Sequence, residues 1–366
     1  MIKRLFIYLT IVLFSLASEG AERTKSISQI IGQPSQKSVE FSILAVQAKD
    51  GKVLYSRNAE KSMIPASNMK VISSAAALHY LGSEYQFQTQ LAMLGNSVVV
   101  IGGGDPLLGD TQVDQRYGRK PGWIFRELVH VLQERGITAV EDVIVDSFFF
   151  DQNRVHSAWP ADQLNQWYAC EISGLNYNLN CVRITASRQG ERVMLAMEPQ
   201  NDYVTLINQV RQINKGNSAL GAYRSAVPNN LIIKGNLNKQ AGFDVAIERP
   251  AGLFANVLAR SINQAGITVN GQVVQKYVSG EPGLVILKTF PSPIWDTLNR
   301  CNKDSLGLAA ECLIKTISAE NTKGRINGEW PHGLTLVGRY LNSLGLDDAQ
   351  FHLDDGSGLS RNNRLS

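Results

Sequence analysis

A serine and a lysine three residues apart carry the clearest chemistry in this sequence. Ser67 and Lys70 lie at the start of an alanine- and leucine-rich stretch that predicts a helix ending at Gly82. Positions i and i+3 of a helix share one face, so the Lys70 amine can approach the Ser67 hydroxyl and, once neutral, remove its proton. The spacing predicts an activated serine nucleophile, although a serine-capped helix with a surface lysine gives the same pattern.

The segments on either side of this helix predict strands and turns that position it. Residues 39–46 and 52–55 are apolar and flank Asp50-Gly51, which indicates a β-hairpin before Ser67. A short valine-rich strand at residues 98–101 ends in Gly102-Gly103-Gly104-Asp105-Pro106, which predicts a turn. The lysine of a phosphate-binding loop does not follow these glycines, so a nucleotide site is not indicated.

Three later segments repeat the order helix, glycine, short strand. The predicted helices cover residues 123–135, 253–265 and 334–344, and each is followed by glycine and an apolar strand. This order favours α/β layering. Residues 200–245 are rich in Asn, Gln and Gly with short Val and Ile runs, which indicates a small β-rich insertion.

Composition and the amino terminus indicate an exported globular protein. The chain is 44% hydrophobic and 19% charged, with a net charge of +4 that includes Lys3 and Arg4, so nucleic acid is not an expected partner. Residues 1–21 combine those two charges with an apolar run and small residues, as a secretory signal does. We expect a periplasmic or cell-envelope location. An uncleaved anchor is the alternative and would add peripheral membrane contact.

Cysteines and histidines do not indicate a metal site. Cys170 and Cys181 form one sequence pair, Cys301 and Cys312 another, and neither pair has zinc-ligand spacing. Disulfides and free buried thiols both remain open for an exported protein of this size. The five histidines are scattered, and we expect no metal and no cofactor.

Five strings occur in one order along the chain, and together they carry a family resemblance. They are Ser67-Asn68-Met69-Lys70 in its helix, Gly102–Pro106, Val145–Asp151 with Trp159-Pro160, Glu171–Asn178 with Asn180-Cys181, and Asp355-Gly356-Ser357-Gly358-Leu359-Ser360-Arg361. Over roughly residues 38–366 the sequence resembles the D-alanyl-D-alanine carboxypeptidase/endopeptidase family of low-molecular-mass penicillin-binding proteins, class C or peptidase S13. The resemblance implies a hydrolase that cleaves the D-Ala-D-Ala bond or D-Ala cross-link of peptidoglycan, with β-lactams as inhibitors.

The resemblance also implies roles for particular residues. Ser67 is then the nucleophile, Lys70 its general base, and Ser305 the hydroxyl that relays a proton to the leaving group. Leu359 and Arg361 are implied to form the pocket for the side chain of the peptidoglycan stem peptide.

An acidic partner for the diaminopimelate amine of the stem peptide is implied near the middle of the chain. Asp146 is the candidate, with Asp151 as a second choice. Both residues could equally be turn caps.

Two positions depart from the family pattern. Gly307 stands where the Ser-x-Asn motif has asparagine, and no Lys-Thr-Gly string occurs before Ser366. We therefore interpret the chain as a gene fragment or a degenerate pseudoenzyme, and expect no D-alanine release and at most weak labelling by penicillin. We also expect poor stability, with exposed apolar surface on the hairpin and on the Ser67 helix. A non-catalytic peptidoglycan-binding scaffold is the alternative function, and a β-lactamase a weaker third.

The predicted fold is an α/β penicillin-binding-protein or β-lactamase-like domain, incomplete at its carboxyl end, with a large, mainly β insertion. The catalytic domain is expected to combine residues 24–85 with 285–366, and the insertion to cover residues 86–284.

Overall fold

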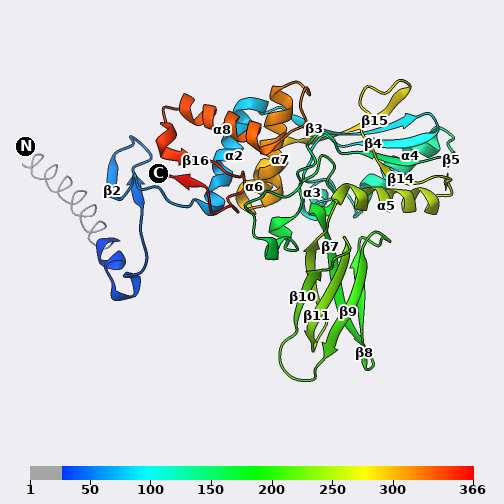
Figure 1. The fold of residues 1–366 in the computed structure, drawn as a ribbon, viewed down its shortest axis with the longest axis horizontal. Coiled ribbons are helices and arrows are strands. Elements are labelled where there is room, and N and C mark those ends of the chain that lie inside the picture. Colours follow the sequence, from blue (N-terminus) through cyan, green and yellow to red (C-terminus); the bar gives the residue numbers. More distant parts are fainter. Residues whose placement is uncertain (1–26) are drawn as a thin grey trace, which may run out of the picture. The chain divides into compact units, whose positions relative to one another are not determined.

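The computed structural model describes residues 27–366, which form two compact units (Figure 1). One unit contains residues 27–64, 347–352 and 364–366, and the other contains residues 65–346 and 353–363. The predicted signal segment, residues 1–21, lies outside the described residues. No helix among the described residues has the length and apolar character needed to cross a bilayer.

The smaller unit contains the predicted hairpin. Strands β1 (Ile43–Val46) and β2 (Val53–Arg57) pair antiparallel around a turn in which Gly51 has a φ of 71°. Two short strands, β16 (Phe351–His352) and β17 (Arg364–Leu365), also pair antiparallel. The expected exposed apolar side chains are present on the hairpin, and they are Leu44, Val46, Val53 and Leu54.

A helical cluster in the larger unit joins residues from distant parts of the chain. Helix α2 (Met69–Leu81) packs against α6 (Ile294–Lys303), α7 (Gly307–Asn321) and α8 (Trp330–Ser343). Every residue of α7 from Gly307 to Ala319 is buried. The expectation that the apolar face of the Ser67 helix is uncovered was therefore wrong, because these three helices cover it. Only Val71 of α2 is an exposed large apolar residue.

A five-stranded mixed sheet follows α2 and has the order β14-β6-β4-β3-β15. Its strands are β3 (Gln86–Leu94), β4 (Ser97–Ile101), β6 (Val143–Asp146), β14 (Val273–Gln275) and β15 (Leu284–Pro293). Helices α4 (Trp123–Glu134) and α5 (Pro250–Gln264) share one buried apolar core with this sheet. Both helices were predicted, and their apolar residues recur at the 3.6-residue period of a buried helix face. A short helix, α3 (Thr111–Arg116), and a parallel pair, β5 (Ala139–Val140) with β13 (Thr268–Val269), complete this part.

Two three-stranded sheets form the β-rich insertion that the Asn- and Gln-rich region predicted. One has the order β12-β7-β8 and the other β10-β11-β9. Their strands are β7 (Cys181–Gln189), β8 (Arg192–Glu198), β9 (Thr205–Gln212), β10 (Ala219–Arg224), β11 (Asn230–Leu237) and β12 (Ala241–Ala246). Residues 86–284 thus contain α3, α4 and α5 as well as strands. The division at residues 85 and 285 stays a prediction, because one compact unit spans both positions.

Candidate active site

The candidate nucleophile lies in the turn that opens helix α2. Ser67 is the middle residue of the short 3-10 helix η2 (Ala66–Asn68), which continues directly into α2. The expectation that Ser67 lies within one residue of a helix start is confirmed. Its side chain is exposed, and Ala66 before it has a φ of 45°, a conformation that alanine rarely adopts. Such backbone strain is commonly found at functional sites.

The Lys70 amine lies between the Ser67 hydroxyl and a backbone carbonyl from the far end of the chain. Lys70 Nζ is 3.2 Å from Ser67 Oγ and donates to the Ser357 carbonyl oxygen at 2.7 Å. The lysine side chain is 5% exposed. Burial lowers the pKa of the Lys70 amine from its usual 10.5, because a buried ammonium loses hydration. A neutral amine beside an exposed serine hydroxyl is the arrangement that general-base activation needs.

The loop that contains Ser357 packs directly against the turn of the nucleophile. Ser73, one turn after Lys70, donates from Oγ to the Gly356 carbonyl at 2.6 Å. A Cβ atom at Gly358 would lie 1.8 Å from the Ala66 carbonyl oxygen, and Gly358 has a φ of 78°. Both the close approach and the positive φ therefore require glycine at position 358. This contact explains Gly358 of the Asp355–Arg361 string.

A buried carboxylate on α7 holds the same loop by its backbone. Glu311 accepts hydrogen bonds from Ser357 N at 2.7 Å, from Gly356 N at 3.0 Å and from the Trp330 Nε1 at 2.7 Å. Burial, together with the nearby Asp355 carboxylate, raises the pKa of Glu311 to about 7. Glu311 therefore fixes the carbonyl that accepts from Lys70.

A second buried carboxylate closes the loop on itself. Asp355 accepts from Gly358 N at 2.8 Å, from Ser360 N at 2.7 Å and from Trp159 Nε1 at 2.9 Å. Sequence reasoning missed Glu311 and Asp355 as parts of the site. The sequence did contain a signal for both, because each is an acidic residue in an otherwise apolar or glycine-rich stretch. A carboxylate buried in such a stretch must be stabilised by hydrogen-bond donors from elsewhere in the fold.

The second motif lies in the connection between α6 and α7. Ser305 is exposed, with a φ of 57°, and among the described residues it makes no hydrogen bond to Lys70. Two residues later, a Cβ atom at Gly307 would lie 3.7 Å from the Ser357 Cβ. The structure thus brings the start of α7 to the loop that Lys70 contacts. The proton-relay role of Ser305 stays a prediction.

Restoring asparagine at position 307 is expected to destabilise the fold. A Cβ atom there would lie 2.9 Å from the Tyr168 carbonyl oxygen, so backbone must shift. Glycine in a helix is otherwise about 1 kcal/mol worse than alanine. Because overpacking costs about 1–3 kcal/mol, we expect both Gly307→Ala and Gly307→Asn to lower the free energy of unfolding.

Denaturant unfolding of both variants beside the wild type measures this effect. A Gly307→Asn variant as stable as the wild type would contradict the prediction. It would show that the Tyr168 carbonyl can move away from the new side chain at little cost.

Leu359 and Arg361 follow in the loop after Gly358. Leu359 is partly buried against the core of the helical cluster, and Arg361 is exposed. Both therefore belong to the segment that carries Ser357. Their contribution to a stem-peptide pocket stays a prediction.

Asp146 and Asp151 lie in different surroundings. Asp146 is buried at the end of β6, where its carboxylate accepts from Phe148 N at 2.9 Å and from Val278 N at 2.8 Å. These are the contacts of a turn cap, the alternative left open for Asp146. Asp151 forms an ion pair with the buried Lys315. No contact joins Asp146 to Lys70 among the described residues, and its binding role stays a prediction.

The four cysteines are free and buried. Burial raises the pKa of the Cys301 thiol to about 11 and that of Cys170 to about 12, so these thiols remain protonated at neutral pH. Within residues 27–366, no three His, Cys, Asp or Glu side chains gather as metal ligands would.

Comparison with known proteins places the whole arrangement in one family. The model of the D-Ala-D-Ala carboxypeptidase 3 (S13) family matches residues 23–366. The chain belongs to this family. The resemblance inferred from the five strings is confirmed.

Two curated bacterial proteins are similar to this chain over most of its length. A D-alanyl-D-alanine carboxypeptidase of Actinomadura sp. (strain R39) is 28% identical over 94% of this chain and 66% of its own length. D-alanyl-D-alanine carboxypeptidase DacB of Haemophilus influenzae is 23% identical over 98% of this chain and 74% of its own length. The chain thus spans about two thirds to three quarters of these relatives.

Solved structures agree on the fold. Penicillin-binding protein 4 (dacB) from Haemophilus influenzae matches with a TM-score of 0.73 at 24% identity, over 89% of this chain and 72% of that one. The same protein complexed with a β-lactam matches with a TM-score of 0.68 at 22% identity, over 90% and 72%. The predicted penicillin-binding-protein fold with a sheet-rich region is confirmed.

Proposed function

We propose that this S13-family chain carries the acylation site of a serine-type D-Ala-D-Ala carboxypeptidase that acts on peptidoglycan stem peptides. The observation that carries the proposal is the contact between exposed Ser67 Oγ and buried Lys70 Nζ, at 3.2 Å. Family membership supports the same reaction. A non-catalytic scaffold is not favoured, because it has no need of a buried amine beside an exposed hydroxyl, a costly arrangement to maintain.

The proposed reaction proceeds in two acyl transfers. Lys70 takes the Ser67 proton as Oγ bonds to the carbonyl carbon of the penultimate D-alanine, and the C–N bond to the terminal D-alanine breaks as that nitrogen gains a proton. Ser305 is the proposed relay for this second proton. Water then cleaves the ester and restores the Ser67 hydroxyl.

The oxyanion of each step needs a donor close to the nucleophile. The Ser67 backbone N–H at the start of η2 is the proposed donor, because the first N–H groups of a helix lack partners within it. Leu359 and Arg361 are proposed to contact the stem-peptide side chain, with Asp146 as a further candidate.

We further propose endopeptidase action on D-Ala cross-links, inhibition by β-lactams, and export to the periplasm or cell envelope. The signal-like composition of residues 1–21 supports export. Peripheral membrane contact belongs to the alternative in which this segment is retained.

Labelling by a fluorescent penicillin tests the proposal directly. We expect weak covalent labelling of the purified chain that disappears in Ser67→Ala, because a strained β-lactam asks less of the supporting site than an unstrained peptide does. Ser83→Ala is the matched control, since Ser83 is exposed just after the other end of α2. D-alanine release from a D-Ala-D-Ala peptide is measured in parallel. Labelling that persists in Ser67→Ala would rule out Ser67 as the nucleophile.

A further inference from the structure

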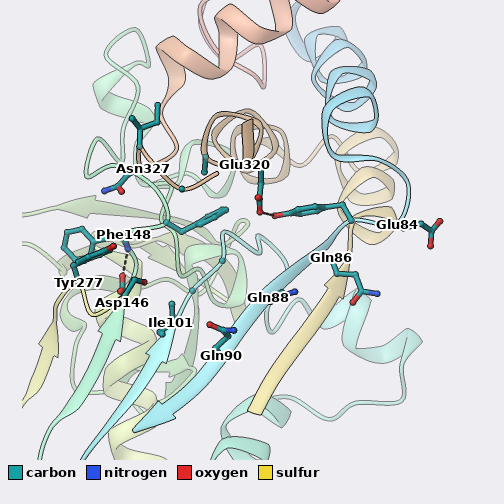
Figure 2. A pocket seen from close by; sticks show the side chains of 18 residues that line it. Glu84, Gln86, Gln88, Gln90, Ile101, Asp146, Phe148, Tyr277, Glu320 and Asn327 are labelled. Carbon is teal, nitrogen blue, oxygen red and sulfur yellow. Dashed lines mark hydrogen bonds between the residues drawn. The ribbon is translucent and has the colours of Figure 1, made fainter. Parts of the chain in front are cut away.

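A second cavity lies at the opposite end of the helices that form the candidate active site. It has a volume of about 640 Å³ and is bordered by the segment after α2 and by the carboxyl end of α7 (Figure 2). Both helices begin beside Ser67 and Ser357 and, at 1.5 Å per residue, run about 18 Å before reaching the cavity. Of the residues that line the cavity, only Asp146 is also a candidate for contact with the substrate of the proposed acyl transfer.

Unpaired amide side chains line one wall of the cavity. Gln86, Gln88 and Gln90 alternate along β3, so they project from one face of the strand. Among the described residues their side chains make no hydrogen bond. Each amide offers two donors and one acceptor to a ligand. In Figure 2 Gln88 and Gln90 lie one after the other along the strand.

Aromatic rings form the opposite wall. Tyr277 and Phe148 pack edge to face, with centroids 6.1 Å apart and planes at 81°. Tyr277 is 54% exposed, so its ring is accessible to a ligand in the cavity. The buried Asp146 accepts from Phe148 N and from Val278 N, the neighbour of Tyr277, so one carboxylate holds both ring-bearing segments. The wall is therefore preorganised.

The glycine loop after β4 forms the floor between these walls. A Cβ atom at Gly103 would lie 2.4 Å from the Gln88 carbonyl oxygen, and one at Gly102 would lie 2.3 Å from the Gly174 carbonyl oxygen. Glycine allows the loop to approach β3 closely at Gly103 and the backbone of Gly174 closely at Gly102. Close backbone packing thus explains why these two residues are glycine, and the proposed acyl transfer does not explain it.

Charge narrows the class of ligand. The lining contains the carboxylates of Glu84, Asp146 and Glu320 and no lysine or arginine, which disfavours an anionic ligand. The Glu320 carboxylate already accepts from the Tyr85 hydroxyl, at 2.9 Å, and Asp146 from the two backbone N–H groups. A peptide strand has no edge to pair with, because β3 lies between β4 and β15.

We propose that this cavity binds a neutral oligosaccharide of N-acetylated hexosamines. The apolar face of a pyranose ring stacks on Tyr277, and the hydroxyl and acetamido groups hydrogen-bond to Gln88 and Gln90. A volume of about 640 Å³ lies within the range of small-ligand sites and accommodates a short glycan. The proposal does not depend on acyl transfer at Ser67.

Calorimetric titration of the purified chain with N-acetylated chitotetraose tests this site. We expect saturable binding that weakens by about tenfold or more in Tyr277→Ala, as expected for loss of a central aromatic contact, and also weakens in Gln88→Ala. Tyr223→Ala is the matched control, because Tyr223 on β10 is also 54% exposed but lies outside the cavity. Thermal unfolding of each variant checks that the fold is retained.

Three results of this titration would overturn the assignment, and a fourth would come from Ser67→Ala. They are the absence of saturable binding to the wild type, equal weakening in Tyr223→Ala, and tighter binding of a glycan-free stem peptide that competes with the sugar. The Ser67→Ala variant separates this proposal from the catalytic one. Loss of oligosaccharide binding in Ser67→Ala would place the sugar in the acylation site and overturn the assignment. Failure of penicillin labelling, with oligosaccharide binding retained, would contradict the catalytic proposal alone.

Discussion

Replacing Lys70 by methionine is expected to slow acylation of Ser67 by a factor of about 10² to 10⁴, the usual contribution of a positioned general base. Methionine keeps an unbranched apolar chain of similar length in a position that is 5% exposed, so packing against α6 and α7 is retained. What is lost is the amine that lies 3.2 Å from Ser67 Oγ. The measurement is the rate of labelling by a fluorescent penicillin.

The pH dependence of the wild type identifies the base. Only the neutral amine accepts a proton, and burial lowers the pKa of Lys70, so its neutral fraction at any pH below 10.5 exceeds that of an exposed lysine. The acylation rate is therefore expected to rise with pH and to level off at an apparent pKa below 10.5. Lys70→Met should remove this rise while keeping cooperative unfolding. An unchanged pH profile in Lys70→Met would show that another group is the base.

The exchange Glu311→Gln is expected to slow acylation by about 10²-fold, although Glu311 does not contact Ser67. The carboxylate accepts three hydrogen bonds, from Ser357 N, Gly356 N and Trp330 Nε1. Glutamine offers one oxygen and turns its NH₂ group toward at least one of these donors, which must then move away. The Ser357 carbonyl that orients Lys70 moves with them, and a misplacement of about 1 Å can cost about 10²-fold.

A stability measurement distinguishes this positioning role from simple unfolding. The pKa of Glu311 is raised to about 7 from 4.5, so between these values the folded protein retains a proton that the unfolded chain has lost. Wild-type stability therefore falls as pH rises through this window, and Glu311→Gln removes that slope. The stability of the wild type relative to the variant should be larger at pH 4.5 than at pH 8.

Denaturant unfolding at the two pH values, with Glu134→Gln as an exposed helical control, measures the difference. Normal labelling by Glu311→Gln would show that the loop does not depend on this carboxylate. A stability difference that stays constant with pH would contradict the raised pKa.

Local sequence signals were sufficient to predict these secondary-structure elements and the Ser67–Lys70 pair. Alanine-rich helix α2, its stop at Gly82, the Asp50-Gly51 hairpin and helices α4 and α5 follow from propensity and periodicity, which act over a few neighbouring residues. The i, i+3 spacing of Ser67 and Lys70 is of the same kind, and their contact was predicted from it.

Only the tertiary structure decided what surrounds that pair. Ser357, Glu311 and the start of α7 meet Lys70 across more than 230 positions of sequence, and whether a buried ion such as Glu311 finds donors depends on which backbone groups the fold turns toward it. The covering of α2 by α6, α7 and α8 was predicted wrongly for this reason. Residue order alone determined the helix and the contact between Ser67 and Lys70. The buried charges and the loop around this pair exist only once distant segments pack, because their energies come from desolvation and long-range contact.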